Sequence, residues 1–437
     1  MKRKNKFLIV LCMATVFGVG CSSNYEENES SISDTKNEAK NSPDESSEEE
    51  VTVWAWDKTF NGFAMEEADK IYNDADINFV EMGKADVLQK LHTVLASGVT
   101  DELPEVVAIS DLNAQGYLMS YPGSFKAVDE KINYNDFAAY KEPMLSFDGV
   151  GYGVPFDTGV AGLFYRKDYI EEVGYTEEDM QNLTWDKYIA LGELLKEKGH
   201  YLQTYNPNDV SEFQIMLQSA GTWFTDEAGN ANFENNEALK QCFEIFKTFN
   251  DSDNVKLVSD WTEFTGAINS GDVACVIRGS WISPTIMQEP SQSGLWSVAP
   301  VPSLNVELAT NYSNQGGSSW FILENSTNAD VALDFLANTF ASSTELYNTL
   351  LGEKNIMGTY LPAGDVDAFN IEMEFYGGQK LNADLANWLS KIPAVYTGAY
   401  SAEAQEALKA VMPTYLQNGD LQKALEDATI QYSQMVQ

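Results

Sequence analysis

Two hydrophobic periods alternate along the chain after residue 50, and their order predicts an α/β fold. Residues 51–56 and 106–109 are short, nearly continuous apolar runs rich in β-branched and aromatic residues, which is typical of buried strands. Residues 86–97 instead carry apolar side chains at helical spacing and are followed by Gly98, a residue that commonly ends helices. A helix at 63–72 and a strand at 77–81 complete a strand, helix, strand, helix, strand order. We expect a parallel or mixed sheet with ligand groups at the carboxyl ends of its strands.

The same patterns continue toward the C-terminus. We expect helices at 184–198, 211–220, 237–249, 264–270, 329–339, 402–410 and 421–435, and strands at 273–278 and 295–299. The glycine-rich residues 149–157 lack the spacing of a phosphate-binding loop, so we interpret them as a hairpin and a crossing between domains. A chain of 437 residues exceeds the size of one hydrophobic core, which predicts two lobes.

The first 50 residues differ from the rest. Basic residues at 2–6 precede an apolar stretch, 7–20, that is short for a membrane span, so residues 1–21 are predicted to be a signal peptide. Residues 18–24 resemble a bacterial lipobox that would lipidate Cys21, although Gly18 stands where Leu is usual. Residues 22–50 are acidic and polar, and we expect a disordered tether. The predicted location is the extracellular face of the cell membrane, with a lipid anchor.

Charge and cysteine content narrow the partners. The formal charge of −39 argues against nucleic acid or an anionic membrane surface as a direct partner. Cys242 lies on the apolar face of a predicted helix and Cys275 in a predicted strand, which favours two buried free thiols. A disulfide between them stays open, because sequence does not show their distance.

Catalytic patterns are scarce. The chain has two histidines, His92 and His200, and lacks a metalloprotease, nucleophile-elbow, phosphate-loop or paired-cysteine motif. We therefore expect neither an enzyme nor a cofactor or metal site. A glycosidase that works with two carboxylates stays open, because 66 acidic residues provide many candidates.

Tryptophans carry the most specific chemistry. Trp56 and Asp57 end the first predicted strand, where an aromatic face and a carboxylate suit the apolar and hydroxyl sides of a pyranose. Alternation along the strand places Trp54 opposite to Trp56, so one of the two is predicted to be core. Other tryptophans stand in loop-like segments, where they either fill the core or line a ligand cleft: Trp223, Trp261, Trp281 and Trp320.

Several short motifs occur together in a particular order. They are Val51–Asp57, Leu103–Val107 leading to Asp111, Tyr152–Asp157 with Leu163–Asp168, Thr184–Asp186, Gly271–Ala274 with Gly279–Trp281, Trp296–Pro302 and Gly316–Trp320. With this order and spacing the chain resembles the family 1 extracellular solute-binding proteins, the maltose-binding-protein-like sugar-binding lipoproteins of bacterial ABC importers. The resemblance covers nearly everything after the tether.

The resemblance implies a two-lobed periplasmic-binding-protein-like α/β fold with a hinge and a ligand cleft between the lobes. Lobe 1 would comprise residues 51–157 and 310–361, and lobe 2 residues 158–309 and 362–437, with crossings near 154–160, near 308–316 and around Pro362. It also implies that Trp281 is an aromatic platform for the ligand and that Trp320 faces the cleft. The remaining implied ligand-binding residues are Trp56, Asp57, Asp111 and Asp157 near lobe 1 and the hinge, and Trp223, Trp261 and Arg278 in lobe 2.

The function that we expect is the substrate-binding subunit of an ABC transporter, a monomer that captures a neutral mono- or oligosaccharide and delivers it to the permease. Lobe closure would exclude water and strengthen the polar contacts. Two alternatives stay open. One is a secreted glycoside hydrolase, and the other is the same fold with a polyamine or another cation as its ligand, which the charge of −39 would also suit.

Overall fold

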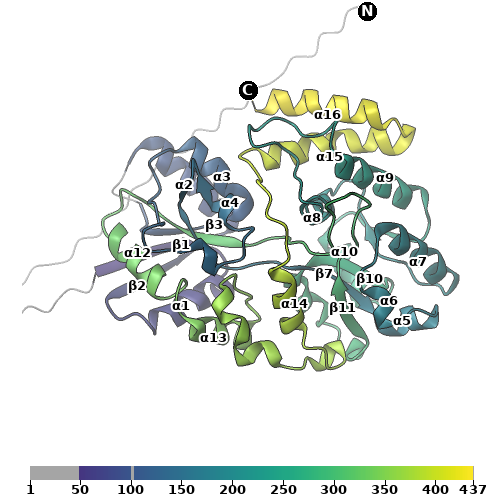
Figure 1. Ribbon diagram of the computed structural model, residues 1–437, viewed down its shortest axis with the longest axis horizontal. Coiled ribbons are helices and arrows are strands. Elements are labelled where there is room, and N and C mark those ends of the chain that lie inside the picture. Colours follow the sequence, from purple (N-terminus) through teal and green to yellow (C-terminus); the bar gives the residue numbers. More distant parts are fainter. Residues whose placement is uncertain (1–48, 100–102, 437) are drawn as a thin grey trace, which may run out of the picture. The chain divides into compact units, whose positions relative to one another are not determined.

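Two sheets of different construction organise residues 49–99 and 103–436, which the computed structural model describes (Figure 1). The first sheet has five strands in the order β2-β1-β3-β12-β6. Strand β1 pairs parallel with β2 and β3, whereas β12 pairs antiparallel with β3 and β6, so the sheet is mixed, as predicted. Its strands are β1 (Glu49–Ala55), β2 (Ala75–Glu81), β3 (Val106–Ser110), β6 (Gly153–Pro155) and β12 (Ser318–Ile322).

The N-terminal predictions fall almost wholly outside the described residues. This holds for the signal peptide, for Cys21 and for the tether up to residue 48. Strand β1 already begins at Glu49, which pairs with Ala75, so the last two residues of the predicted tether belong to the first sheet. No helix in the described part of the chain is long and apolar enough to cross a membrane.

The second sheet is antiparallel throughout, in the order β10-β7-β11. Its strands are β7 (Ala161–Arg166), β10 (Cys275–Gly279) and β11 (Trp296–Pro300). Two smaller pairs accompany the sheets: β4 (Ser146–Phe147) with β5 (Val150–Gly151), and β8 (Thr204–Tyr205) with β9 (Lys256–Leu257). The β4-β5 pair is the hairpin expected at the start of the glycine-rich segment.

Helices surround each sheet (Figure 1). Around the first sheet lie α1 (Phe63–Asp69), α2 (Lys84–Ser97), α3 (Asp111–Ser120), α4 (Glu142–Leu145), α12 (Ala329–Asn338) and α13 (Thr344–Lys354). The segment between β7 and β11 contains α5 (Lys167–Glu172), α6 (Glu177–Met180), α7 (Trp185–Glu197), α8 (Ser211–Ser219), α9 (Glu237–Asp251), α10 (Trp261–Asn269) and α11 (Ser283–Ile286). The chain ends with α14 (Leu381–Leu389), α15 (Ser401–Asn418) and α16 (Leu421–Met435), and the last two pack on each other.

Helix α10 begins three residues earlier than the sequence pattern suggested. The Asp260 side chain accepts a hydrogen bond from the Glu263 backbone N–H at 2.9 Å, which caps the helix at its first turn. Trp261 therefore occupies the first helical position, where the apolar pattern is not yet visible.

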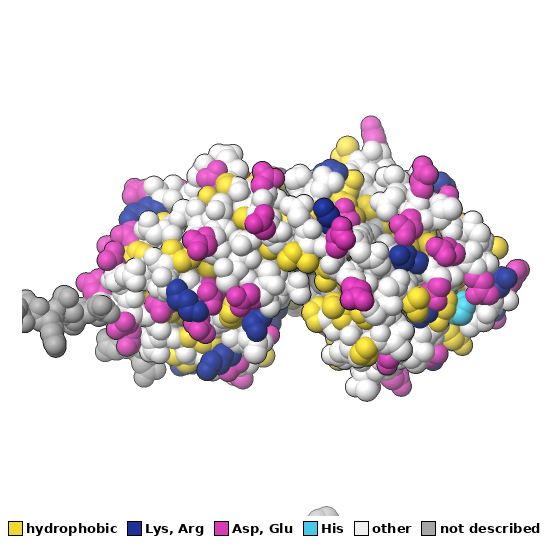
Figure 2. Space-filling view, turned by 90° about the horizontal axis from the view of Figure 1, so that it is seen from below, with side chains coloured by type: hydrophobic (Ala, Val, Ile, Leu, Met, Phe, Trp, Pro, Cys, Tyr) yellow, Lys and Arg dark blue, Asp and Glu magenta, His cyan; other side chains and the backbone are white. Residues whose placement is uncertain are grey.

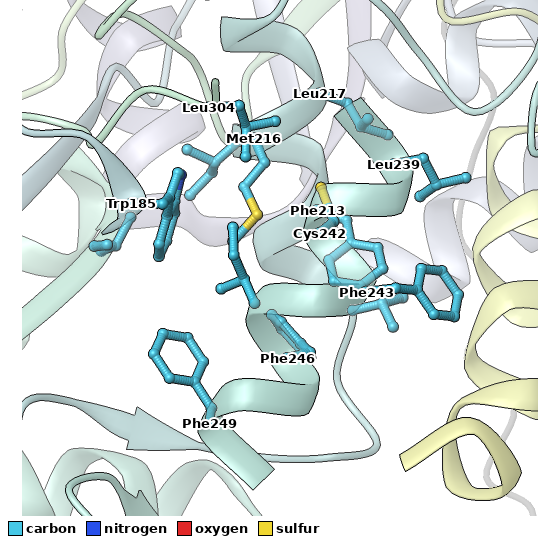
Figure 3. Packing of buried hydrophobic residues seen from close by; sticks show 14 of the residues in the cluster. Trp185, Phe213, Met216, Leu217, Leu239, Cys242, Phe243, Phe246, Phe249 and Leu304 are labelled. Atoms are coloured by element: carbon cyan, nitrogen blue, oxygen red, sulfur yellow. The ribbon is translucent and has the colours of Figure 1, made fainter. Parts of the chain in front are cut away.

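The core beside the second sheet confirms the prediction of two buried free thiols. Figure 3 shows Cys242 on α9 among the rings of Phe213, Phe243 and Phe246. Cys275 lies in β10, and both thiols are free and inaccessible to solvent. Burial raises the pKa of the Cys275 thiol to about 12, so it stays protonated and inert at neutral pH.

The chain passes from the first sheet to the second between β6 and β7, and it returns between β11 and β12. These two crossing segments lie side by side. Val160 and Asn314 form an antiparallel bridge, and the Asn314 side-chain oxygen accepts hydrogen bonds from the Gly159 N–H at 2.9 Å and the Thr158 hydroxyl at 3.0 Å. We call the parts of the molecule formed around the first and second sheets the first side and the second side.

Candidate functional site

A cavity of about 680 Å³ lies where both sides meet the crossing segments. Ser110 and Leu112 line it from the end of β3 and the start of α3, and Gln315 and Gly316 line it from the returning segment. The second side supplies most of the lining, including Tyr205, Asn206, Asn208, Asp209, Ser211, Glu212, Asp260, Trp261, Phe264, Arg278 and Trp281. Figure 2 shows the surface hollowed between its two halves, with acidic and basic side chains dispersed over both.

Trp281 is fixed by its edge and open on its face. It follows β10, and its indole Nε1 donates a hydrogen bond of 2.7 Å to the Gln315 carbonyl oxygen. A Cβ at Gly159 would lie 3.0 Å from its Cδ1 atom, and one at Gly279 would lie 2.4 Å from its Nε1 atom, so two glycines make room for the ring. The side chain nevertheless stays 44% exposed and lines the cavity. This geometry leaves a fixed apolar ring face open to the cavity.

Trp261 offers a second open ring beside the first. It is 54% exposed, and its centroid lies 6.3 Å from that of Trp281 at an interplanar angle of 36°. Its ring stacks on Phe264 at 5.0 Å, which fixes its position on α10. Two neighbouring aromatic faces in one polar cavity suit a flat ligand with apolar C–H patches and hydroxyl edges.

Arg278 is part of an ordered polar chain at the same place. Its Nη1 atom lies 2.8 Å from Glu212 Oε1, and its guanidinium lies over the Phe264 ring at 5.1 Å from the centroid. Glu212 Oε2 accepts from the Gln203 amide at 3.3 Å, and the Gln203 oxygen accepts from the Tyr188 hydroxyl at 2.7 Å. Desolvation raises the pKa of Glu212, while the positive charge of Arg278 acts against that shift.

Asp111 and Asp157, which were expected as ligand groups near the first sheet, do not line the cavity, and both have partners within the protein. Asp111 is buried, and its Oδ2 lies 2.6 Å from Lys141 Nζ, while its Oδ1 accepts from the Ser319 hydroxyl at 2.8 Å. Lys141 is fully buried and also donates to the Ser318 carbonyl oxygen at 3.2 Å. Asp111 therefore helps to fix the start of β12 through Lys141 and Ser319, and both of its oxygens already have partners.

Asp157 and Lys84 lie close to this pair. Asp157 Oδ1 accepts hydrogen bonds from the Ser318 N–H at 2.7 Å and the Ser318 hydroxyl at 2.5 Å. Desolvation raises the pKa of Asp157, and the charge of Lys141 only partly offsets it. Lys84 lines the cavity and is exposed. Desolvation by the surrounding protein lowers its pKa, although the negative charges of Asp157 and Asp111 act in the opposite direction.

Trp56 and Asp57 follow strand β1 and do not line the cavity. Trp54 is buried and Trp56 is partly exposed, which confirms that one of the two belongs to the core. The Trp56 ring centroid lies 5.3 Å from Nζ of Lys84, a residue that lines the cavity. Asp57 is exposed, has a φ of 57° and accepts from the Thr59 N–H and hydroxyl, at the start of the π-helical segment Asp57–Gly62.

The structure does not bring Trp320 or Trp223 to the cavity. Trp320 is fully buried in β12 and stacks on Phe156 with centroids 5.1 Å apart, so it fills the core beneath the first sheet instead of facing the cleft. Trp223 is also buried, and its Nε1 donates to the Ser401 hydroxyl at 2.7 Å. Glycine and hydroxyl residues precede both tryptophans in the sequence and suggested ligand positions, but in the structure both rings belong to the core.

Gln315 joins the parts of this site, although no sequence motif singled it out. The Gln315 N–H donates to the Gly159 carbonyl oxygen, its carbonyl oxygen accepts from Trp281, and its side chain contacts the Gly279 N–H and the Ser211 carbonyl oxygen. Glu212 was missed as well. A lone Gln in a loop and a Glu in an amphipathic helix carry no local signal, because their partners are distant in sequence.

Among the described residues, no cluster of three or more His, Cys, Asp or Glu side chains is arranged to hold a metal ion. The cavity is lined by two open rings, amides, hydroxyls and paired charges.

Comparisons with known proteins agree with this architecture. The chain is 42% identical to the lactose-binding protein of Rhizobium radiobacter over 386 residues, which cover 86% of this chain and 92% of that protein. It is 25% identical to the arabinooligosaccharide-binding protein of Halalkalibacterium halodurans over 278 residues, 59% of this chain and 60% of that protein.

Solved structures share the two-lobed α/β fold. A family 1 extracellular solute-binding protein matches with a TM-score of 0.75 at 15% identity, covering 89% of this chain and 100% of that one. The galacto-N-biose/lacto-N-biose I-binding protein of an ABC transporter from Bifidobacterium longum matches with a TM-score of 0.69 at 20% identity, covering 90% and 98%. The model of the family described as bacterial extracellular solute-binding protein matches residues 58–363. The chain thus belongs to the bacterial extracellular solute-binding proteins, the family that its sequence motifs indicated.

Proposed function

We propose that the protein is the substrate-binding subunit of an ABC transporter, which holds a neutral mono- or oligosaccharide in the cavity between its lobes and delivers it to the membrane permease. The observation that carries this proposal is Trp281, whose edge is fixed by Gln315 and the adjacent glycines while its face stays open in a polar cavity. Stacking on such a ring contributes about 0.5 to 1.5 kcal/mol beyond the burial of area. A few hydrogen bonds to charged groups, at about 1.5 to 3 kcal/mol each, would bring binding to the micromolar range after ordering costs.

The charge of the cavity supports a neutral ligand. Although the chain carries a formal charge of −39, the lining contains three basic side chains, Lys84, Arg278 and Lys409, and three acidic ones, Asp209, Glu212 and Asp260. A polyamine would require an excess of carboxylates at the site itself. This balance favours a sugar over the cationic ligand.

The state of the lining carboxylates supports binding without catalysis. Asp260 caps α10, Glu212 pairs with Arg278, and Asp209 accepts a hydrogen bond from the Ser211 N–H at 2.9 Å. A glycosidase needs one carboxyl free to donate a proton and another free to act as nucleophile or base. Each lining carboxylate here has a structural partner instead.

The relatives suggest which sugars to test first. A relative at 42% identity is a lactose-binding protein, and a solved structure with a TM-score of 0.65 at 22% identity, which covers 89% of this chain and 96% of that one, holds β-1,6-galactobiose. Lactose and galactobiose are therefore the first probes, followed by arabinooligosaccharides and maltooligosaccharides.

The proposed location combines the family with the N-terminal sequence. The family is extracellular. A lipid on Cys21 would anchor this chain, which we expect to be a monomer, at the outer face of the membrane next to the permease. Labelling with a radioactive fatty acid tests the anchor. The wild type should incorporate label, and Cys21→Ala should not.

A thermal-shift screen tests the proposed ligand class. The purified protein is heated with neutral mono- and oligosaccharides, with spermidine and galacturonate as charged controls. A ligand at about one hundred times its Kd adds about 2.7 kcal/mol of stability, which is a shift of a few degrees. We expect a shift with at least one neutral sugar, whereas a shift with spermidine alone would overturn the proposal.

A further inference from the structure

The cavity contains one cation that is held rigidly, and its charge is balanced from within the protein. Arg278 Nη1 donates to Glu212 Oε1 at 2.8 Å and to the Ile277 carbonyl oxygen at 2.9 Å. The Arg278 side chain is only 11% exposed, whereas Lys84 and Lys409 are more exposed, and Lys409 pairs with Glu406 at 3.3 Å. We infer that Glu212 is the specificity-determining residue that disfavours anionic ligands in the cavity, because its carboxylate neutralises the positive charge of Arg278. This inference rests on the proposed function.

Glu212 cannot turn away from Arg278. It lies in the first turn of α8 with a side chain that is 10% exposed, and its second oxygen accepts from the Gln203 amide. Gln203 is itself fixed by the Tyr188 hydroxyl. A carboxylate held in this way stays beside the guanidinium of Arg278.

Asp209 is a natural comparison within the same cavity. Its Oδ2 lies 3.8 Å from Arg278 Nη2, beyond hydrogen-bond distance, and its side chain is 44% exposed. Solvent screens an exposed pair at this distance far more than a buried one at 2.8 Å. Asp209 alone therefore compensates Arg278 much less than Glu212 does.

The test replaces each carboxylate by its neutral amide and uses sulfate as the probe. Glu212→Gln keeps the size and hydrogen-bonding atoms of the side chain but removes the charge that balances Arg278, and Asp209→Asn is the matched control. Sulfate is titrated at constant ionic strength, and its binding is followed by tryptophan fluorescence, because Trp261 and Trp281 line the same cavity. Circular dichroism and the unfolding transition verify that each variant is folded.

We expect Glu212→Gln to bind sulfate about tenfold or more tightly than the wild type, a change of about 1.4 kcal/mol, and Asp209→Asn to change it less. The double variant Glu212→Gln with Arg278→Gln should lose this gain. If Glu212→Gln does not fold, Glu212→Ala removes the same charge without adding bulk and must show the same gain. Equal sulfate affinity in the wild type and the folded Glu212 variants overturns the inference.

The outcome of the sulfate titration does not depend on the outcome of the sugar screen. A wild type that binds none of the sugars removes the proposed function, but the sulfate titration needs no sugar and still reads the charge balance. If a neutral sugar binds, sulfate should compete with it in Glu212→Gln and not in the wild type.

Discussion

The two sides of the cavity differ in what they leave open to a ligand. The second side presents Trp261 and Trp281, which are 54% and 44% exposed. Behind the lining of the first side, Asp111 and Lys141 are buried against each other and against the crossing segment. One side therefore offers surface that a ligand can cover, and the other offers a closed polar frame.

This difference separates affinity from architecture. Open aromatic rings are costly to leave in water and become favourable when a ligand covers them. A buried ion pair is costly to desolvate, and it stabilises the fold only while every partner is in place. Substitutions on the second side should thus change binding, and those on the first side should change stability.

Lys141→Met should give the largest effect. It leaves the Asp111 carboxylate buried without its cation, which should lower the free energy of unfolding by about 3 to 5 kcal/mol. Urea denaturation measures the change. The control is Lys126→Met, which breaks the exposed pair with Asp330 at 2.9 Å and should cost about 1 kcal/mol or less. Equal losses in the two variants would contradict a structural role for the buried pair.

Trp320→Ala should destabilise the protein without weakening the sugar complex. Removing a fully buried indole that stacks on Phe156 leaves a core cavity and should cost about 3 to 5 kcal/mol. Affinity measured below the melting transition should stay close to that of the wild type. A large loss of affinity with little loss of stability would place Trp320 at the ligand after all.

Gly159→Ala should affect both properties, because Gly159 lies where the two sides join. A Cβ there would lie 2.1 Å from the Gln315 carbonyl oxygen and 3.0 Å from Trp281 Cδ1, so the seat of the indole must shift. We expect a loss of about 1 to 3 kcal/mol in stability together with weaker sugar binding. Gly266→Ala in α10 is the control, since a Cβ there has nothing within 4 Å. It should be neutral or slightly stabilising.

Asp157→Asn should give the smallest effect, visible in the pH dependence of stability. Desolvation raises the pKa of Asp157 above its ordinary 3.8, so the folded state holds this proton more tightly than the unfolded state. The stabilisation from this group is complete below pH 3.8 and is lost as the pH rises through the raised pKa. The stability of the wild type relative to Asp157→Asn should therefore fall as the pH increases, and urea denaturation at several pH values would show the opposite trend if the pKa were depressed.

Much of the fold could be predicted because its elements have strong local patterns. Helix α9, with apolar residues at helical spacing, and the buried strands β1 and β3 agree closely with the predicted ranges. Local patterns did not predict β12, α13 or α14, which pack against segments that are distant in sequence. The exact lobe limits stay a prediction.

The site was less predictable than the fold, because local context does not reveal exposure. Trp281 and Trp320 both follow glycine and hydroxyl residues, yet one lines the cavity and the other fills the core. Asp111 was expected to bind the ligand, but its carboxylate pairs with Lys141, which lies 30 positions away in the sequence. Gln315 carried no motif, although it connects Trp281 with both crossing segments.

We propose that a neutral sugar binds on the open face of Trp281. Isothermal titration calorimetry of the wild type and Trp281→Ala with lactose, or with another neutral sugar that shifts the melting temperature, tests it most directly. We predict that Trp281→Ala binds at least about tenfold more weakly, a loss of about 1.4 kcal/mol, with an unchanged unfolding transition. Equal affinity in the two proteins would mean that the sugar does not stack on Trp281.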